Sequence, residues 1–242
     1  MARAAAFAAV LIGAASGWAQ SPPSGPVPVR LGPCLAAEAG APAWEVLRLG
    51  RRPPTTYSVV EEKGARAVQA VSRRGAALLF VRVDADLADT PILRWRWRVV
   101  DAPDGGDLRT IERDDAAARV VVGFRYTRAL VPPGQRLAYL MFKLRHGEFP
   151  PYSALAYVWS AHPPAGTALR HPDYERLHQV VLHDARDADG RWREERRDLL
   201  ADYRDAFGAP PPRVSHVAVM SDADDTKGRS EAWFRDLELL PR

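Results

Sequence analysis

The stretch that decides the fold is Arg94-Trp95-Arg96-Trp97-Arg98-Val99, in which basic and apolar side chains alternate strictly. Side chains two residues apart share one face of a strand, so Trp95, Trp97 and Val99 point together and the arginines point the other way. Burying two tryptophans contributes at most about 8–12 kcal/mol, at roughly 25 cal/mol per Å². The pattern predicts a strand at the centre of a core. The alternative leaves the two rings exposed as a platform for sugars.

The arginine face needs partners, because three cations in a row repel one another. Asp114 and Asp115 precede a second β-like run at residues 118–126, and they could supply the carboxylates if the two strands pair. We expect internal ion pairing. An anionic ligand bound to the arginine face is the alternative.

Short β-like runs with turn residues between them recur along most of the chain. They lie at residues 44–49, 57–61, 66–72, 77–83, 92–100, 118–126, 154–160, 179–183, 214–220 and 231–239. Their number and spacing predict an all-β fold, a β-sandwich or jelly roll, rather than a fold of alternating strands and helices. In the run 154–160, Leu155, Tyr157 and Trp159 share a face that could be core or the lining of a groove; we expect core.

Two segments have helical periodicity. Residues 135–145 place Leu137, Leu140, Met141 and Leu144 at helical spacing. Residues 198–207 predict a second helix, with Asp198 as its N-cap and Gly208 at its end.

The N-terminal segment, Met1 to Ala19, has the pattern of a secretory signal peptide: Arg3, a short apolar region and small residues before a cut after Ala19. Residues 20–43 are rich in Ser, Pro and Gly and predict an extended leader without core. Residues 44–242 predict a single β-sandwich domain. No other apolar run approaches the roughly 20 residues of a membrane span. The protein is therefore expected in the periplasm or outside the cell, and its single cysteine, Cys34, excludes an internal disulfide.

The charge pattern argues against nucleic acid as a partner. The formal net charge is +4, and acidic residues lie between the arginines, so no face of one sign is indicated. Motifs for a serine hydrolase elbow, a phosphate-binding loop, a dinucleotide fold and a zinc helix are missing from the sequence. The six histidines show no ligand spacing.

The acidic turn Ser221-Asp222-Ala223-Asp224-Asp225-Thr226 is the strongest candidate for a metal site. It does not fit the EF-hand loop, because Lys227 stands where that loop needs glycine. A looser calcium site formed by Asp222, Asp224, Asp225 and Asp236 is the prediction. The alternative is that Lys227 and Arg229 neutralise these acids without an ion.

Several blocks together resemble an uncharacterised bacterial family, domain of unknown function 3047. The matching blocks are Leu93-Arg94-Trp95-Arg96-Trp97-Arg98-Val99, Asp114-Asp115-Ala116-Ala117-Ala118-Arg119-Val120, Leu155-Ala156-Tyr157-Val158-Trp159, Trp192 with Glu195-Arg196, Ala201-Asp202-Tyr203-Arg204-Asp205-Ala206-Phe207-Gly208 and Met220-Ser221-Asp222-Ala223-Asp224-Asp225-Thr226. The resemblance implies an exported, single-domain bacterial protein and brings no established activity.

The final run, residues 231–239, is also similar to the last strand of galactose-binding-like jelly rolls and some carbohydrate-binding modules. In those folds an aspartate near the position of Asp236 often helps to hold a structural calcium. This likeness rests on one strand and implies a fold more than a function.

Three functions follow from these observations. The first is a non-catalytic binding module of the bacterial envelope, with a glycan or another envelope component as its ligand; Asp114, Asp115, Arg119, Trp95, Trp97, Tyr157 and Trp159 are the candidate ligand-binding residues. The second is a carboxylate-based glycan hydrolase or lyase, which requires the acids of two loops to converge around a cleft. The third is a structural or interaction protein without a small-molecule ligand. The sequence alone does not assign an oligomeric state.

Overall fold

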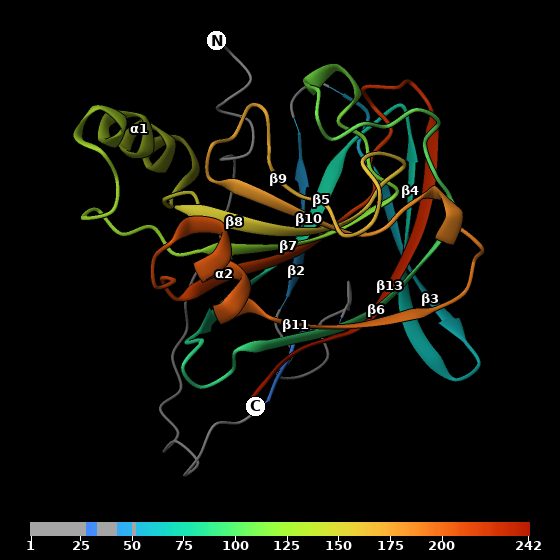
Figure 1. Ribbon diagram of the computed structural model, residues 1–242, viewed down its shortest axis with the longest axis horizontal. Helices are drawn as coiled ribbons and strands as arrows, with labels where there is room; N and C mark the ends of the chain where they lie inside the picture. Colours follow the sequence, from blue (N-terminus) through green and yellow to red (C-terminus); the bar gives the residue numbers. More distant parts are fainter. Residues whose placement is uncertain (1–27, 33–42, 50–51) are drawn as a thin grey trace.

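The computed structural model describes residues 28–32, 43–49 and 52–242, except for the side chains of Arg145 and His146. The signal peptide, most of the predicted leader and Cys34 lie outside the described residues. Within them, two β-sheets pack face to face, and the two α-helices lie at the margins (Figure 1). The expectation of an all-β sandwich is confirmed.

The first sheet has six strands in the described residues, in the order β11-β6-β13-β4-β3, and β1 pairs with β13. In chain order its strands are β1 (Val29–Arg30), β3 (Thr56–Glu62), β4 (Ala65–Arg73), β6 (Ile92–Asp101), β11 (Arg193–Asp198) and β13 (Arg229–Leu240). All of its pairings are antiparallel.

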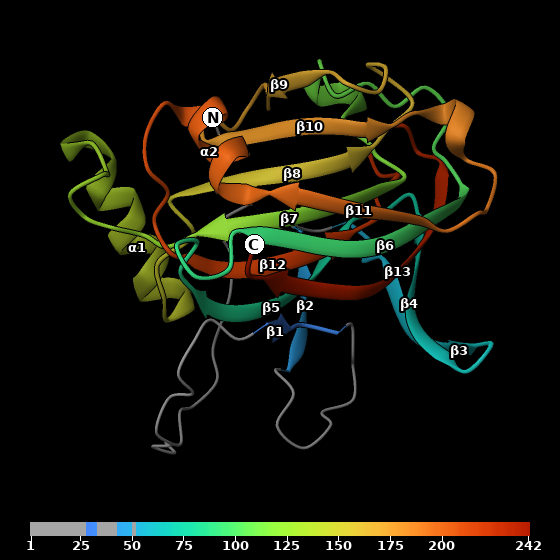
Figure 2. The same ribbon diagram turned by 60° about the horizontal axis from the view of Figure 1, so that its bottom comes forward.

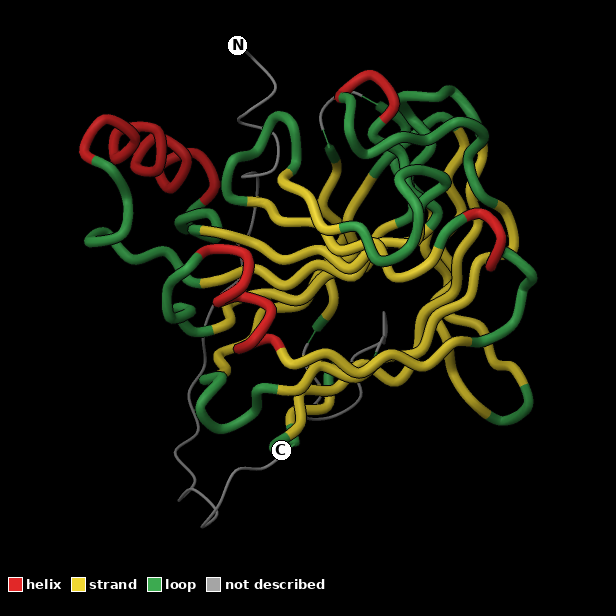
Figure 3. Tube along the Cα trace, in the orientation of Figure 1, coloured by secondary structure: helices red, strands yellow, loops and turns green. Residues whose placement is uncertain are grey.

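The second sheet has seven described strands, in the order β2-β5-β12-β7-β8-β10-β9. These are β2 (Trp44–Arg48), β5 (Ala77–Ala85), β7 (Ala118–Phe124), β8 (Ser153–Trp159), β9 (Ala168–Arg170), β10 (Leu177–His183) and β12 (Val214–Met220). The pair β8–β10 is parallel, and the other pairs are antiparallel. Figure 3 shows the strands of the two sheets as separate layers, with loops gathered at their ends.

The core between the sheets is built by the alternating residues that the sequence singled out. Trp95 and Trp97 of β6 are fully buried. The Trp95 ring lies 5.1 Å from that of Tyr157, and the Trp97 ring 5.6 Å from that of Trp159, so β6 packs on β8 of the other sheet. Core is the correct interpretation of these four aromatics, and the sugar platform is wrong.

The arginines of β6 are paired, but not with the predicted partners. Arg94 bonds Glu238 of β13 at 2.6 Å, Arg96 bonds Glu194 of β11 at 2.6 Å, and Arg98 bonds Glu62 of β3 at 3.1 Å. Asp114 and Asp115 lie beside the other sheet, because β7 pairs with β8 and β12 and not with β6. Internal ion pairing is confirmed, and its assignment to Asp114 and Asp115 is wrong.

The predicted leader is not free of core. Val29–Arg30 form β1, and Leu31 is 2% exposed. Leu31 also accepts a hydrogen bond from the indole nitrogen of Trp44 at 2.8 Å, which ties this segment to the start of β2.

Both predicted helices form. Helix α2 (Leu199–Phe207) begins at the N-cap Asp198, whose carboxylate accepts from the backbone of Leu200 and Ala201, and it ends at Gly208 in the left-handed region. Its Tyr203 contacts Phe124 at 4.5 Å between ring centroids, so α2 covers one open end of the core. Helix α1 (Arg136–His146) lies at the edge of the molecule, away from the sandwich interface (Figure 2). Three short 3-10 turns complete the described helical segments: η2 (Ile111–Arg113), η3 (Pro133–Gln135) and η4 (Ala185–Asp187).

Candidate functional site

The outer face of the seven-stranded sheet, which points away from the six-stranded sheet, carries the candidate sites. Its middle is apolar and includes Val121 of β7, Ala156 and Val158 of β8 and Ala218 of β12. Charged residues lie at its two ends, with Arg119 near the start of β7 and Arg125 just after its end. We call the cluster around Arg119 the Arg119 network, and the cavity at the other end the outer-face pocket.

In the Arg119 network one guanidinium donates hydrogen bonds to two carboxylates. Arg119 donates to Asp114 Oδ1 at 3.0 Å and to Asp222 Oδ2 at 3.3 Å, and also to the side-chain oxygen of Gln179 at 2.9 Å. His171 contacts the second oxygen of Asp114 at 2.6 Å. His171 Nδ1 accepts from the backbone N–H of Asp173, so Nε2 carries the proton and donates to Asp114.

The two carboxylates of this network have pKa values shifted in opposite directions. Burial raises the pKa of Asp222 to about 8, although Arg119 opposes the shift. Burial also acts on Asp114, but Arg119 and His171 outweigh it and hold the pKa of Asp114 below its usual value. One cation thus keeps Asp114 ionised, while Asp222 retains a proton near neutral pH.

Asp115 has a different task. One of its carboxylate oxygens accepts from the backbone of Asp224 at 3.0 Å and Asp225 at 3.1 Å, and the other accepts from Thr226 at 2.6 Å. These bonds fix the acidic turn against the loop before β7. Asp115 is therefore a buried residue that anchors the acidic turn.

The calcium site predicted from Asp222, Asp224, Asp225 and Asp236 does not assemble as predicted. The acids whose oxygens approach within 4.8 Å of one another are Asp115, Asp224 and Asp225. Arg52 reaches into this group, pairing with Asp224 and lying 3.0 Å from Asp225. Asp222 belongs to the Arg119 network, and Asp236 lies on β13 beside Arg96 at 3.8 Å. Arg52, rather than Lys227 and Arg229, is the main counter-charge.

The two acidic loops do converge, as the hydrolase hypothesis requires. Three of their carboxylates are nevertheless closed to solvent, because Asp115, Asp222 and Asp224 are each at most 5% exposed. Arg119 is likewise buried, and Trp95, Trp97, Tyr157 and Trp159 lie in the core. None of the sequence-predicted ligand residues, apart from partly exposed Asp114, presents its side chain to a ligand.

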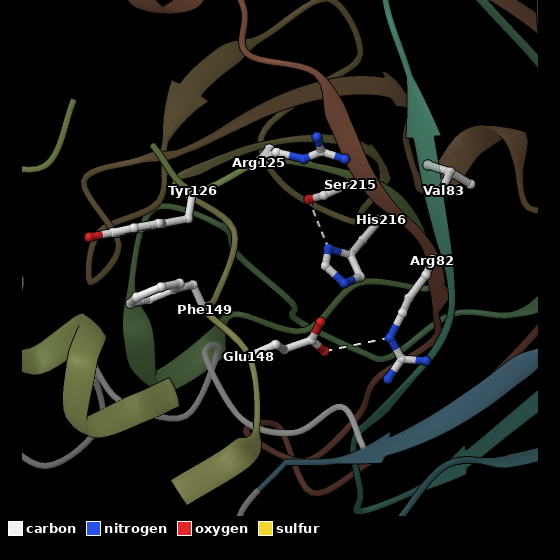
Figure 4. A pocket seen from close by; sticks show the side chains of 8 residues that line it. All are labelled: Arg82, Val83, Arg125, Tyr126, Glu148, Phe149, Ser215 and His216. Carbon is white, nitrogen blue, oxygen red and sulfur yellow. Dashed lines mark hydrogen bonds and ion pairs between the residues drawn. The ribbon is translucent and has the colours of Figure 1, made fainter. Parts of the chain in front are cut away.

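The outer-face pocket is a cavity of about 390 Å³ at the other end of the sheet (Figure 4). Its lining comes from the ends of β5 and β12, the segment after β7 and the segment after α1. The lining residues are Arg82, Val83, Arg125, Tyr126, Glu148, Phe149, Ser215 and His216. The rings of Tyr126 and Phe149 stack with centroids 4.0 Å apart and an interplanar angle of 12°.

Three buried polar atoms in this pocket have no hydrogen-bond partner among the described residues. They are Arg82 Nη2, Glu148 Oε1 and His216 Nε2. Figure 4 shows these three side chains directed toward one another. Buried polar groups in folded proteins are nearly always satisfied, so such a concentration indicates a place where a ligand or water completes the bonding.

The protonation of His216 follows from its neighbours. Ser215 donates its hydroxyl proton to the carbonyl of Gly123 at 3.2 Å, so its oxygen accepts from His216 Nδ1 at 2.9 Å. Burial, helped by Arg82, lowers the pKa of His216 to about 4. Neutral His216 therefore presents an unprotonated Nε2 as an acceptor. Burial also raises the pKa of Glu148, and Arg82 Nε lies 3.6 Å from its carboxylate.

Sequence reasoning did not identify this pocket. Arg82, Glu148 and His216 stand in no recognisable motif, and their meeting depends on pairing between β5 and β12, which lie far apart in the chain. The strand predicted at residues 118–126 includes Tyr126. The observed strand ends at Phe124, which frees Tyr126 to line the pocket.

Comparison with known proteins gives one sequence match. A family model described as "Protein of unknown function (DUF3047)" matches residues 42–238. No curated protein matches the sequence.

Solved structures with a similar course of the backbone include two carbohydrate-binding modules and a glycoside hydrolase. The family 11 carbohydrate-binding module of a Clostridium thermocellum cellulosomal cellulase has 8% identity and a TM-score of 0.41, covering 84% of this chain and 91% of that chain. The family 30 module of another cellulase of that organism has 12% identity and a TM-score of 0.40, covering 90% and 95%. Endoglucanase 3 of Trichoderma harzianum, from family GH12, has 9% identity and a TM-score of 0.41, covering 84% and 92%.

Proposed function

The chain belongs to the DUF3047 family of proteins of unknown function, and we propose that it is an exported, non-catalytic binding protein whose outer-face pocket holds a carbohydrate. The single observation that carries the proposal is that Arg82, Glu148 and His216 line one cavity and that each has a buried polar atom, Arg82 Nη2, Glu148 Oε1 and His216 Nε2, without a hydrogen-bond partner among the described residues.

The three atoms together favour a polyhydroxylated ligand. Arg82 offers a donor, whereas Glu148 and neutral His216 offer acceptors. A hydroxyl group both donates and accepts, so neighbouring hydroxyls of a sugar can satisfy all three atoms. A simple anion could bond to Arg82 but would leave both acceptors unsatisfied.

The remaining lining suits the apolar part of such a ligand. The stacked rings of Tyr126 and Phe149 form one wall, and aromatic surfaces accept the C–H faces of sugar rings. A cavity of about 390 Å³ lies within the usual range for small-molecule sites of about 300–1,000 Å³.

Binding can be tested by isothermal titration calorimetry against a panel of bacterial cell-wall and extracellular glycans and their oligosaccharides. Tryptophan fluorescence is a poor reporter, because no tryptophan of the described residues lines the pocket. Glu148→Gln and His216→Gln are each expected to weaken binding about tenfold or more, since each removes or alters a buried acceptor.

Matched controls exist for both substitutions. Glu194→Gln changes an exposed carboxylate on β11, and His178→Gln changes a half-buried histidine of β10 outside the pocket. Both are expected to bind like the wild type. Absence of binding across the panel, or equal binding by the pocket variants and the controls, would refute the proposal.

Export is a separate part of the proposal and rests on the pattern of residues 1–19. Cell fractionation followed by N-terminal sequencing tests it. A periplasmic or secreted protein that begins at Gln20 is the expected result, and a cytoplasmic protein that retains Met1 contradicts it.

A further inference from the structure

Helix α1 presents an apolar stripe to solvent. Leu137, Leu140, Met141 and Leu144 are 67%, 45%, 57% and 71% exposed. Their spacing of three and four residues places them on one side of the helix. A stripe of four large apolar side chains on one helix differs from the scattered exposed hydrophobics of an ordinary surface.

The opposite side of α1 holds the helix to the body of the protein. Tyr139 packs on Tyr126 with ring centroids 5.0 Å apart, and the ammonium of Lys143 lies 4.6 Å from the ring centroid of Phe149. These contacts fix which side of α1 faces outward. Figures 1 and 2 both show α1 projecting at the edge of the molecule, beyond the sandwich.

The segment that carries the stripe is basic throughout. Residues 127–147 contain no aspartate or glutamate, and they contain Arg128, Arg136, Lys143 and Arg145. By helical spacing, Arg136 falls beside the apolar stripe.

We propose that α1 docks the protein on an anionic lipid surface, with the helix parallel to the membrane plane and the stripe inserted at the boundary between headgroups and acyl chains. An exposed apolar face with basic residues beside it is the pattern of interfacial helices. Arg128 and Arg136 would lie at the level of the anionic headgroups. No helix among the described residues is long and apolar enough to cross a membrane, and α1 is only 11 residues long.

The charge of the segment favours a lipid surface over a second copy of this chain. A symmetric contact through α1 would bring the two basic segments together, and they would repel each other. An anionic bilayer supplies the opposite charge along the whole helix and also a medium for the stripe.

Docking in this orientation would also place the outer-face pocket near the membrane, because Tyr126 and Phe149 contact α1 and line the pocket. The docking itself does not depend on what the pocket binds. Either proposal can therefore be wrong while the other is right.

The test is co-flotation of the full chain with vesicles of phosphatidylglycerol mixed with phosphatidylethanolamine, compared with pure phosphatidylcholine vesicles. Binding to the anionic vesicles is expected, and it should weaken as salt rises. Leu140→Gln combined with Leu144→Gln should lower the partition coefficient at least tenfold. Arg128→Gln combined with Arg136→Gln should lower it about 25-fold, at about fivefold per charge.

The matched control removes two exposed apolar side chains from the six-stranded sheet. Val59→Thr combined with Val100→Thr should bind vesicles like the wild type, and these valines are 38% and 50% exposed. All variants share the same N-terminal residues, so a difference between them reports on α1. Vesicle binding that is equal in wild type and the Leu140/Leu144 variant overturns the proposal.

A second measurement follows the helix directly. Leu144→Cys in a Cys34→Ser background, labelled with an environment-sensitive fluorophore, should shift to the blue on anionic vesicles. No shift on those vesicles would contradict the proposal. Self-association of the lipid-free protein that the Leu140/Leu144 variant abolishes, without vesicle binding, would assign the stripe to a protein contact instead.

Discussion

Arg119 and Asp222 are 103 residues apart in sequence, yet the guanidinium Nη2 of the first lies 3.3 Å from the carboxylate Oδ2 of the second. The pairing of β7 with β12 brings them together, because Arg119 lies opposite Met220 and Asp222 follows two residues later. Asp114 competes for the same guanidinium at 3.0 Å. The network therefore holds one buried carboxylate, one partly exposed carboxylate and one cation, and a proton on Asp222 balances the charge.

The proton on Asp222 makes stability depend on pH. The folded-state pKa is raised to about 8, against about 3.9 for an unfolded aspartate. Between these values the folded protein holds a proton that the unfolded chain lacks, so the free energy of unfolding should fall as pH rises from about 4 to about 8. Melting temperatures of wild type and Asp222→Asn at pH 6 and pH 9 measure this.

The comparison with Asp222→Asn is needed because the titration of His183 also lowers the free energy of unfolding as pH rises. Its pKa is also raised, since Glu195 and Asp187 outweigh the effect of burial. The variant keeps His183 and loses only the titration of Asp222. Its melting temperature should therefore fall less than that of the wild type between pH 6 and pH 9. Parallel losses in both proteins would mean that Asp222 is ionised throughout.

Arg119 and Arg96 provide a test of what burial does to an ion pair. Arg119→Gln leaves the ionised Asp114 without its main partner in a buried place, and we expect a loss of about 3–5 kcal/mol in the free energy of unfolding. Arg96→Gln breaks a pair with Glu194 in which both side chains are more than 40% exposed, and about 0–1 kcal/mol is expected. Urea denaturation measures both. Similar losses for the two variants would contradict a structural role for the Arg119 network.

The sequence predicted single strands well and their partners poorly. Strict alternation in Arg94–Val99 identified a core strand, because burying two tryptophans on one face is more favourable than leaving them exposed. Alternation does not say which strand lies alongside, so the carboxylates opposite these arginines were assigned to the wrong loop. The partner of Arg96 lies on β11, where six successive charged residues, Arg193–Asp198, show no apolar period. Such an edge strand forms through cross-strand ion pairs and is recognised only once β6 is placed beside it.

The candidate site was harder to predict for a related reason. The acids of the Arg119 network and of the acidic turn were identified from composition, but their burial was not. His216 had no suggestive spacing. Its interest lies in an unpartnered Nε2, which depends on Ser215, Gly123 and the packing around them. Hydrogen-bond satisfaction is a property of the folded molecule, and no sequence period reports it.

Arg52 offers a direct test of calcium at the acidic turn. In the wild type its guanidinium already pairs with Asp224 and Asp225, so calcium and chelator should leave the melting temperature nearly unchanged. Arg52→Ala leaves Asp115, Asp224 and Asp225 without this counter-charge. At about 5 mM calcium and a dissociation constant of about 10⁻⁴–10⁻³ M, binding would stabilise the variant by about 1–2 kcal/mol. A strong calcium response of the wild type would show instead that an ion displaces Arg52.

His216 predicts the pH range over which the pocket binds its ligand. Burial and Arg82 lower its pKa to about 4, so Nε2 stays unprotonated and able to accept a hydrogen bond well below the usual pKa of about 6.5. In Glu148→Gln, which lacks the raised pKa of Glu148, the remaining affinity for a glycan should be constant from pH 8 to about pH 5 and should fall only near pH 4. The same shift of the His216 pKa lowers the free energy of unfolding in acid. Between pH 6.5 and pH 4 the histidine of the unfolded chain binds a proton, whereas the buried His216 of the folded protein does not. His216→Gln should therefore lose less stability than the wild type over that interval. An affinity that halves near pH 6.5, as for an exposed histidine, would contradict this prediction. It would mean that His216 is open to solvent and that its Nε2 is not a buried acceptor for the ligand.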